Sequence, residues 1–226
     1  DWKGQIAYTT PNMNGFSATV GVMQPWNVTQ SGTLSATSAG NTDEFGFQGQ
    51  ASYSWTGDFA GKVWAGFFTQ EVTGMTDGAA TPAALTSNQS DTATAYEAGV
   101  SATVMNINLV AYGYSGEGVG TTGMLVQGFD TTGSARDSDG GYVQATYVIP
   151  MGTKLGVSYG VSKLDDNTAD ASKNLVKENN RLTVGAYHPL TKHLNLVAEY
   201  SDVESKSHDG QSATSDIFTV GAILFF

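Results

Sequence analysis

Two short patterns in the sequence carry residue types that could act on a substrate. Residues 156–160 read Gly-Val-Ser-Tyr-Gly and match the Gly-x-Ser-x-Gly pattern, in which a sharp strand-to-helix turn exposes a nucleophilic serine. Residues 118–123 read Gly-Val-Gly-Thr-Thr-Gly and match a phosphate-binding loop, which requires a helix directly after it. No helical pattern follows either segment. We therefore interpret Ser158 as a mid-strand residue and residues 118–123 as a loop, and predict that the chain is not an enzyme.

Metal binding is a second chemistry to consider. Asp137 and Asp139 could offer oxygen ligands to a divalent cation, but no spaced carboxylate completes a calcium loop. His188 and His193 flank one predicted turn, and neither they nor His208 have a third ligand within reach in the sequence. We expect a solvated acidic loop and surface imidazoles, with no metal site and no cofactor.

Composition excludes several classes of protein. The 226-residue chain carries 10 Lys and Arg against 21 Asp and Glu, a net charge of -11, which argues against any nucleic-acid partner. The absence of Cys excludes disulfides and thiolate zinc sites. No stretch approaches the roughly 18 apolar residues of a membrane helix. A membrane β-barrel is not excluded, because only every second residue of its strands must be apolar.

Period-two alternation is the pattern that recurs along the chain. The clearest run is residues 45–55, where aromatic and small residues on one face oppose Gln and Ser on the other. Similar runs predict eleven strands at residues 5–9, 16–24, 45–55, 62–70, 96–104, 107–114, 142–149, 154–162, 181–186, 194–201 and 218–226. Residues 169–182 carry too thin an apolar stripe for a packed helix and are interpreted mainly as a loop.

The predicted connections alternate in length. Short ones lie at residues 11–15, 56–60, 104–106, 150–153 and 190–193, and long polar ones at residues 26–43, 71–91, 115–140, 164–177 and 205–214. Short turns at one end and long loops at the other are typical of up-and-down outer-membrane barrels. We predict an all-β, antiparallel transmembrane β-barrel that forms a single unit over residues 1–226. A soluble extracellular β-sandwich or adhesin domain remains the first alternative, and a membrane-barrel hydrolase is the less favoured second.

Three segments resemble the general porins of Gram-negative bacteria. Residues 4–21 are similar to a strand-turn-strand with Tyr, Pro and Gly-Phe-Ser steps, residues 182–200 are similar to a late hairpin, and residues 218–226 resemble the terminal strand with its final aromatic residue. Porins of this family have sixteen strands, so the resemblance implies that the chain covers roughly the last eleven. It also implies that the folded-in loop that narrows the pore lies outside this chain.

The resemblance carries further expectations. It implies a bacterial outer-membrane location, a homotrimer, and contact with outer-membrane lipid and lipopolysaccharide. It also implies that the terminal strand is the signal for membrane insertion, through Phe218, Val220, Leu224 and Phe226.

Strand parity predicts which side chains would line the channel. The polar positions of the alternating runs are Gln48, Gln50, Ser52, Glu97, Gln144, Lys154, Ser158, Arg181 and Glu199. Amides and hydroxyls dominate this set, which predicts weak discrimination among small hydrophilic solutes and ions. Because most of the acidic residues fall in predicted loops, we expect a mild preference for cations.

Overall fold

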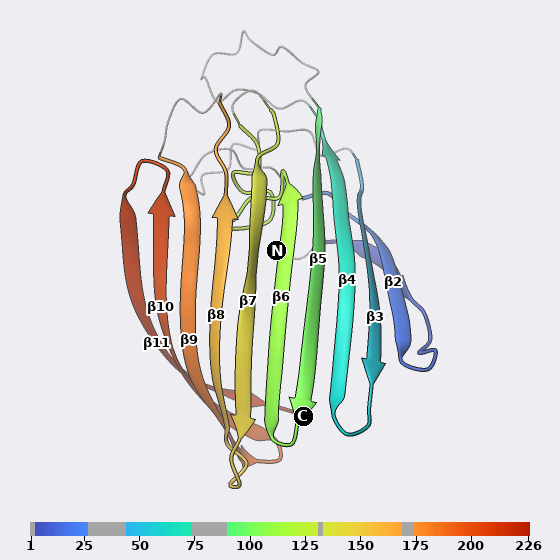
Figure 1. The fold of residues 1–226 in the computed structure, drawn as a ribbon, viewed down its shortest axis with the longest axis vertical. Helices are drawn as coiled ribbons and strands as arrows, with labels where there is room; N and C mark the ends of the chain where they lie inside the picture. Colours follow the sequence, from blue (N-terminus) through green and yellow to red (C-terminus); the bar gives the residue numbers. More distant parts are fainter. Residues whose placement is uncertain (1–2, 27–43, 74–89, 131–132, 169–173) are drawn as a thin grey trace.

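Eleven antiparallel strands form one sheet in which every strand pairs with its neighbours in sequence order (Figure 1). The computed structural model describes residues 3–26, 44–73, 90–130, 133–168 and 174–226. The strands are β1 (Gln5–Thr9), β2 (Phe16–Met23), β3 (Gly46–Trp55), β4 (Ala60–Val72), β5 (Asp91–Val104), β6 (Ile107–Glu117), β7 (Asp137–Val148), β8 (Lys154–Leu164), β9 (Val176–Thr191), β10 (Leu194–Ser207) and β11 (Ser212–Leu224). Nothing helical in the described part has the length and apolarity to cross a membrane.

The topology confirms the predicted all-β, up-and-down fold. Short turns join the strands at the lower end of Figure 1, and the strand ends that the longer connections join lie at the upper end. β1 and β11 are the two edges of the sheet and do not pair with each other. The described residues form one sheet only, so the alternative of a two-sheet sandwich does not hold.

Strand ends at the upper side differ from the sequence prediction. β9 begins at Val176 and β7 at Asp137, within segments that the sequence predicted to be loops. The connection predicted at residues 205–214 is a four-residue turn between Ser207 and Ser212. Hydrogen bonds from the Ser207 hydroxyl and the Gln211 amide lower the pKa of Asp209 in this turn. The alternation ends before the strands do because, outside a hydrocarbon layer, neither face has to be apolar.

The two faces of the sheet differ in chemistry. Residues paired across antiparallel strands point to the same side, so the register places Gln50, Gly66, Glu97 and Tyr114 on one face, which we call the polar face. The opposite, apolar face carries exposed hydrophobic side chains from every strand: Tyr8, Val20, Phe47, Phe67, Tyr96, Leu109, Val143, Tyr159, Val184, Tyr200 and Phe218. A surface of this kind is stable where hydrocarbon rather than water covers it.

The Asn14–Gly15 turn between β1 and β2 provides a test of the fold. Both residues have positive φ, 54° and 97°, and a Cβ on Gly15 would lie 2.2 Å from the carbonyl oxygen of Ser54. We expect Gly15→Ala to lower the free energy of unfolding by about 2 kcal/mol or more, because it adds left-handed strain and a clash. Gly57→Ala is the control, since its Cβ would meet nothing within 4 Å. Urea titration in lipid vesicles measures both variants, and equal effects would contradict the turn geometry.

Candidate functional site

All nine residues predicted to line a channel lie on the polar face, as the strand register shows. They do not form one cluster, because they follow the sheet from β3 to β10. The structure brings some of them into local contact: Gln50 with Glu97 by a hydrogen bond, and Gln144 with Ser158 by cross-strand pairing.

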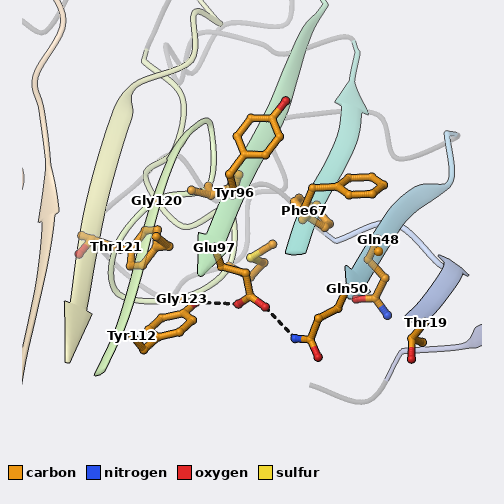
Figure 2. Close-up of a pocket in the computed structure, with 16 residues that line it drawn as sticks. Thr19, Gln48, Gln50, Phe67, Tyr96, Glu97, Tyr112, Gly120, Thr121 and Gly123 are labelled. Carbon is orange, nitrogen blue, oxygen red and sulfur yellow. Dashed lines mark hydrogen bonds between the residues drawn. The ribbon is translucent and has the colours of Figure 1, made fainter. Parts of the chain in front are cut away.

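Glu97 on β5 is the centre of the most developed of these contacts (Figure 2). The side-chain amide of Gln50 donates to Glu97 Oε1 at 2.8 Å, and the hydroxyl of Tyr112 donates to Glu97 Oε2 at 2.8 Å. An ionised carboxylate can only accept hydrogen bonds, so Gln50 must turn its nitrogen toward Glu97. Two neutral donors therefore hold the carboxylate in one orientation, and the amide oxygen of Gln50 is left available.

A glycine makes this contact possible. Gly66 on β4 is the cross-strand partner of both Gln50 and Glu97, so these two side chains must reach each other across the width of a strand. A Cβ on Gly66 would lie 3.0 Å from Glu97 Oε1 and 2.9 Å from the carbonyl oxygen of Gly49. Any side chain at this position would crowd both the Glu97 carboxylate and the carbonyl oxygen of Gly49.

The connection between β6 and β7 folds back onto the polar face, which the sequence did not reveal. It lies near the upper ends of β6 and β7 in Figure 1. Leu125 and Phe129 are fully buried in it, and with Val119 they pack against the polar-face side chains of Met23, Phe68, Val72 and Ala93. This cluster is the main hydrophobic core of the described residues. Residues 118–130 and 133–136 therefore cover part of the polar face.

Hydrogen bonds between side chains and the backbone fix the shape of this inward loop, which we define as residues 118–130 and 133–136. The buried guanidinium of Arg136 donates from Nη1 to the carbonyl oxygens of Gln127 and Phe129, at 2.6 Å and 2.5 Å. The amide of Ala135 donates to the Asp91 carboxylate on β5 at 2.8 Å. Together these contacts tie the loop to the wall without regular secondary structure.

A cavity of about 590 Å³ lies between the inward loop and the polar face. Gln50, Glu97, Tyr112 and Tyr114 border it from the sheet, and Thr121 and Met124 from the loop. Figure 2 shows that Thr121 and Gly123 lie on the same side of the sheet as the Glu97 carboxylate. The volume suits a small solute, and the lining combines one charge with aromatic and amide groups.

A second carboxylate on the polar face has a different setting. Glu199 on β10 accepts a short hydrogen bond from the hydroxyl of Tyr187 on β9, and the Lys154 ammonium lies 5.4 Å from the centre of the Tyr187 ring. Arg181, further up β9, donates to the hydroxyl of Ser201 at 2.9 Å. Neither Glu199 nor Glu97 forms an ion pair in the described residues, although Lys154 and Arg181 belong to the part of the polar face that carries Glu199.

The residues that the sequence offered as a possible nucleophile or as metal ligands are part of the β-sheet or of its connections. Ser158 lies in the middle of β8, paired with Gln144 and Thr183, and is not raised on a turn. Asp137 and Asp139 lie in β7, which corrects their prediction as a loop. Within the described ranges, no three His, Asp or Glu side chains come together as a metal site.

The residues expected to signal membrane insertion lie at the sheet edge. Phe218, Val220 and Leu224 belong to β11, and Phe226 follows it. Phe218 and Val220 pair with Tyr200 and Ala198 on the apolar face. The side chains of Phe218, Val220, Leu224 and Phe226 are each more than 60% exposed. β11 is therefore an exposed edge strand with apolar side chains.

Comparison with known proteins gives one family and one fold. The family model of Gram-negative porins matches residues 1–208. Among solved structures, the outer membrane channel DcaP of Acinetobacter baumannii aligns with a TM-score of 0.78 and 14% identity, over 98% of this chain and 62% of that chain. OprB of Pseudomonas putida, in its high-pH structure, aligns at 0.62 and 11% identity, over 97% and 58%. An anion-selective porin from Comamonas acidovorans aligns at 0.56 and 14% identity, over 97% and 57%.

These alignments establish similarity of fold, since the identities are low. The chain spans about three fifths of the length of these solved structures. No curated protein matches it significantly.

Proposed function

This chain belongs to the Gram-negative porin family, and we propose that it forms the wall of a water-filled channel in the bacterial outer membrane. Small hydrophilic solutes and ions would cross this channel by passive diffusion, with no catalytic step. The polar face would line the water-filled space, and the nine residues from Gln48 to Glu199 named above would contact the solutes.

The segregation of the two faces carries this proposal. Hydrophobic side chains from all eleven strands are exposed on one face, while amides, hydroxyls and charges occupy the other. Burying such an apolar face in hydrocarbon stabilises it by about 25 cal/mol per Å². Every central strand also has both neighbours for its backbone hydrogen bonds, as a lipid environment requires.

The partners of the channel are part of the same proposal. Lipid would cover the apolar face, and lipopolysaccharide would surround the upper end, where the long connections lie. The resemblance to general porins supports a homotrimer. The terminal strand, with Phe218, Val220, Leu224 and Phe226, would be recognised during insertion.

A mild cation preference follows from the position of the acidic residues. Glu71, Asp91, Glu117, Asp137 and Asp139 all lie at the upper strand ends, although the sequence had placed them in loops. Asp43, Asp77 and Asp170, also expected in loops, lie outside the described residues. A negative mouth raises the local concentration of cations, and salt screens the effect over about 10 Å at 0.1 M.

The reversal potential of the channel in planar bilayers tests both function and selectivity. Under a tenfold KCl gradient at low salt, we expect the sign of the potassium equilibrium potential and a permeability ratio of about 2 to 5, decreasing toward 1 near 1 M salt. The anion-selective porin from Comamonas acidovorans has a related fold, so the fold alone does not fix the sign of the reversal potential. That sign would contradict the cation preference, and the absence of conductance steps would contradict the channel itself.

A further inference from the structure

We propose that Glu97 and its neighbours form a binding subsite for small solutes that carry a primary ammonium group. The subsite lies in the cavity between the inward loop and the polar face. Its use during permeation rests on the channel function proposed above, but binding itself does not.

No basic side chain in the part of the chain that the structure describes balances the charge of Glu97. Its two side-chain hydrogen bonds come from the neutral groups of Gln50 and Tyr112, and no cationic side chain of the described residues forms a salt bridge with it. Glu178 on β9 is different, because the Lys206 ammonium lies 3.5 Å from its carboxylate. A partly buried carboxylate without a cation favours a cationic ligand.

The remaining hydrogen-bond acceptors of Glu97 and Gln50 complement the donors of an ammonium ion. A carboxylate oxygen can accept two hydrogen bonds, and each oxygen of Glu97 uses one. The Gln50 amide turns its nitrogen toward Glu97, so its oxygen remains as a further acceptor. An R–NH₃⁺ group has three N–H donors and no acceptor, which complements this set of acceptors.

The walls favour an organic cation over a metal ion. The cavity contains one carboxylate, whereas a divalent ion would require several oxygen ligands of higher charge. The rings of Tyr112 and Tyr114 can attract a weakly hydrated cation through their π faces, and Val119 and Met124 offer apolar contact to an alkyl stem. A volume of about 590 Å³ leaves room for a small amine.

Binding of ethylammonium to the detergent-folded full chain tests the subsite directly. We expect NMR titration to show saturable binding that Glu97→Gln weakens about tenfold, because this change removes the charge and retains the shape. Gly66→Ala keeps the charge but presses a Cβ to within 3.0 Å of Glu97 Oε1, so it should weaken binding severalfold. Gel mobility before and after heating verifies that each variant is folded.

Glu178→Gln is the matched control, since it neutralises a carboxylate on β9 that lies outside the cavity and has no role assigned in the channel. We expect less than a twofold change in ethylammonium affinity. Equal weakening by Glu97→Gln and Glu178→Gln, or saturable binding that Glu97→Gln leaves unchanged, would overturn the subsite. Absence of saturable binding in the folded protein would overturn it too.

Transport measurements separate this inference from the channel proposal. In planar bilayers, Glu97→Gln should lower the permeability of ethylammonium relative to Na⁺ by about threefold or more, with a smaller effect on K⁺ relative to Na⁺. Conductance without this discrimination would overturn the subsite as a selectivity element and leave the channel intact. Glu97-dependent binding without conductance would overturn the channel and retain the binding site.

Discussion

Replacing Val143 by arginine is expected to lower the stability of the protein in a bilayer by about 2 to 4 kcal/mol. Val143 lies in the middle of β7 on the apolar face, is 58% exposed, and pairs with Ala111 and Tyr159. An arginine on the lipid side of a membrane strand costs about 2 to 4 kcal/mol at the bilayer midplane. Since whole proteins are stable by only about 5 to 15 kcal/mol, this loss removes much of the margin. Urea titration in phosphatidylcholine vesicles measures it.

Gln144→Arg is the control for this experiment. Gln144 is the next residue along β7 and points to the polar face, where it pairs with Ser158 and Val110. There an arginine meets water, so the free energy of unfolding should change by less than about 0.5 kcal/mol. Similar losses for the two adjacent variants would mean that the faces do not separate lipid from water, and the transmembrane assignment would be wrong.

Sequence alternation predicted the sheet well because hydrocarbon enforces it residue by residue. Eleven strands, their order and the polar positions from Gln48 to Glu199 follow from one rule, that outward side chains must be apolar. The same rule explains the errors in strand length. β9 starts at Val176 and β7 at Asp137, where both faces are polar and the alternation carries no information.

Contacts across the polar face could not be predicted in the same way. The approach of Gln50 to Glu97 depends on the register of β3, β4 and β5 and on the absence of a side chain at Gly66. The sequence pattern fixes which face a residue occupies, but it does not fix register to the residue. Glu97 could therefore be assigned to the polar face, but its partners could not be identified.

The inward loop escaped prediction for a related reason. Its apolar residues, Val119, Leu125 and Phe129, follow neither a helical nor a strand period. Their partners lie on β2, β4 and β5 and are distant in the sequence. The glycine-rich pattern at residues 118–123 was correctly interpreted as a loop, but nothing in it indicates the face on which the loop packs.

Truncating Phe129 provides the test of that loop. We expect Phe129→Ala to destabilise docking of the inward loop by about 3 to 5 kcal/mol, because the side chain is fully buried among Leu125, Val72 and Phe68. The amide of Leu125, which donates to the Val119 carbonyl, should then exchange its hydrogen at least about 100-fold faster. Single-channel conductance should rise, since an undocked loop no longer covers the wall.

Phe47→Ala is the control for Phe129→Ala, because it also removes an aromatic ring but on the apolar face, away from the inward loop. Phe47 is 50% exposed on the apolar face, where lipid can fill the space that truncation leaves, so loop exchange and conductance should stay close to wild type. The Leu125 amide reports the loop rather than the sheet, because neither it nor its acceptor belongs to a strand. Unchanged exchange in Phe129→Ala would show that Arg136 and its carbonyl contacts hold the loop without the core, and the docking role assigned to Phe129 would be wrong.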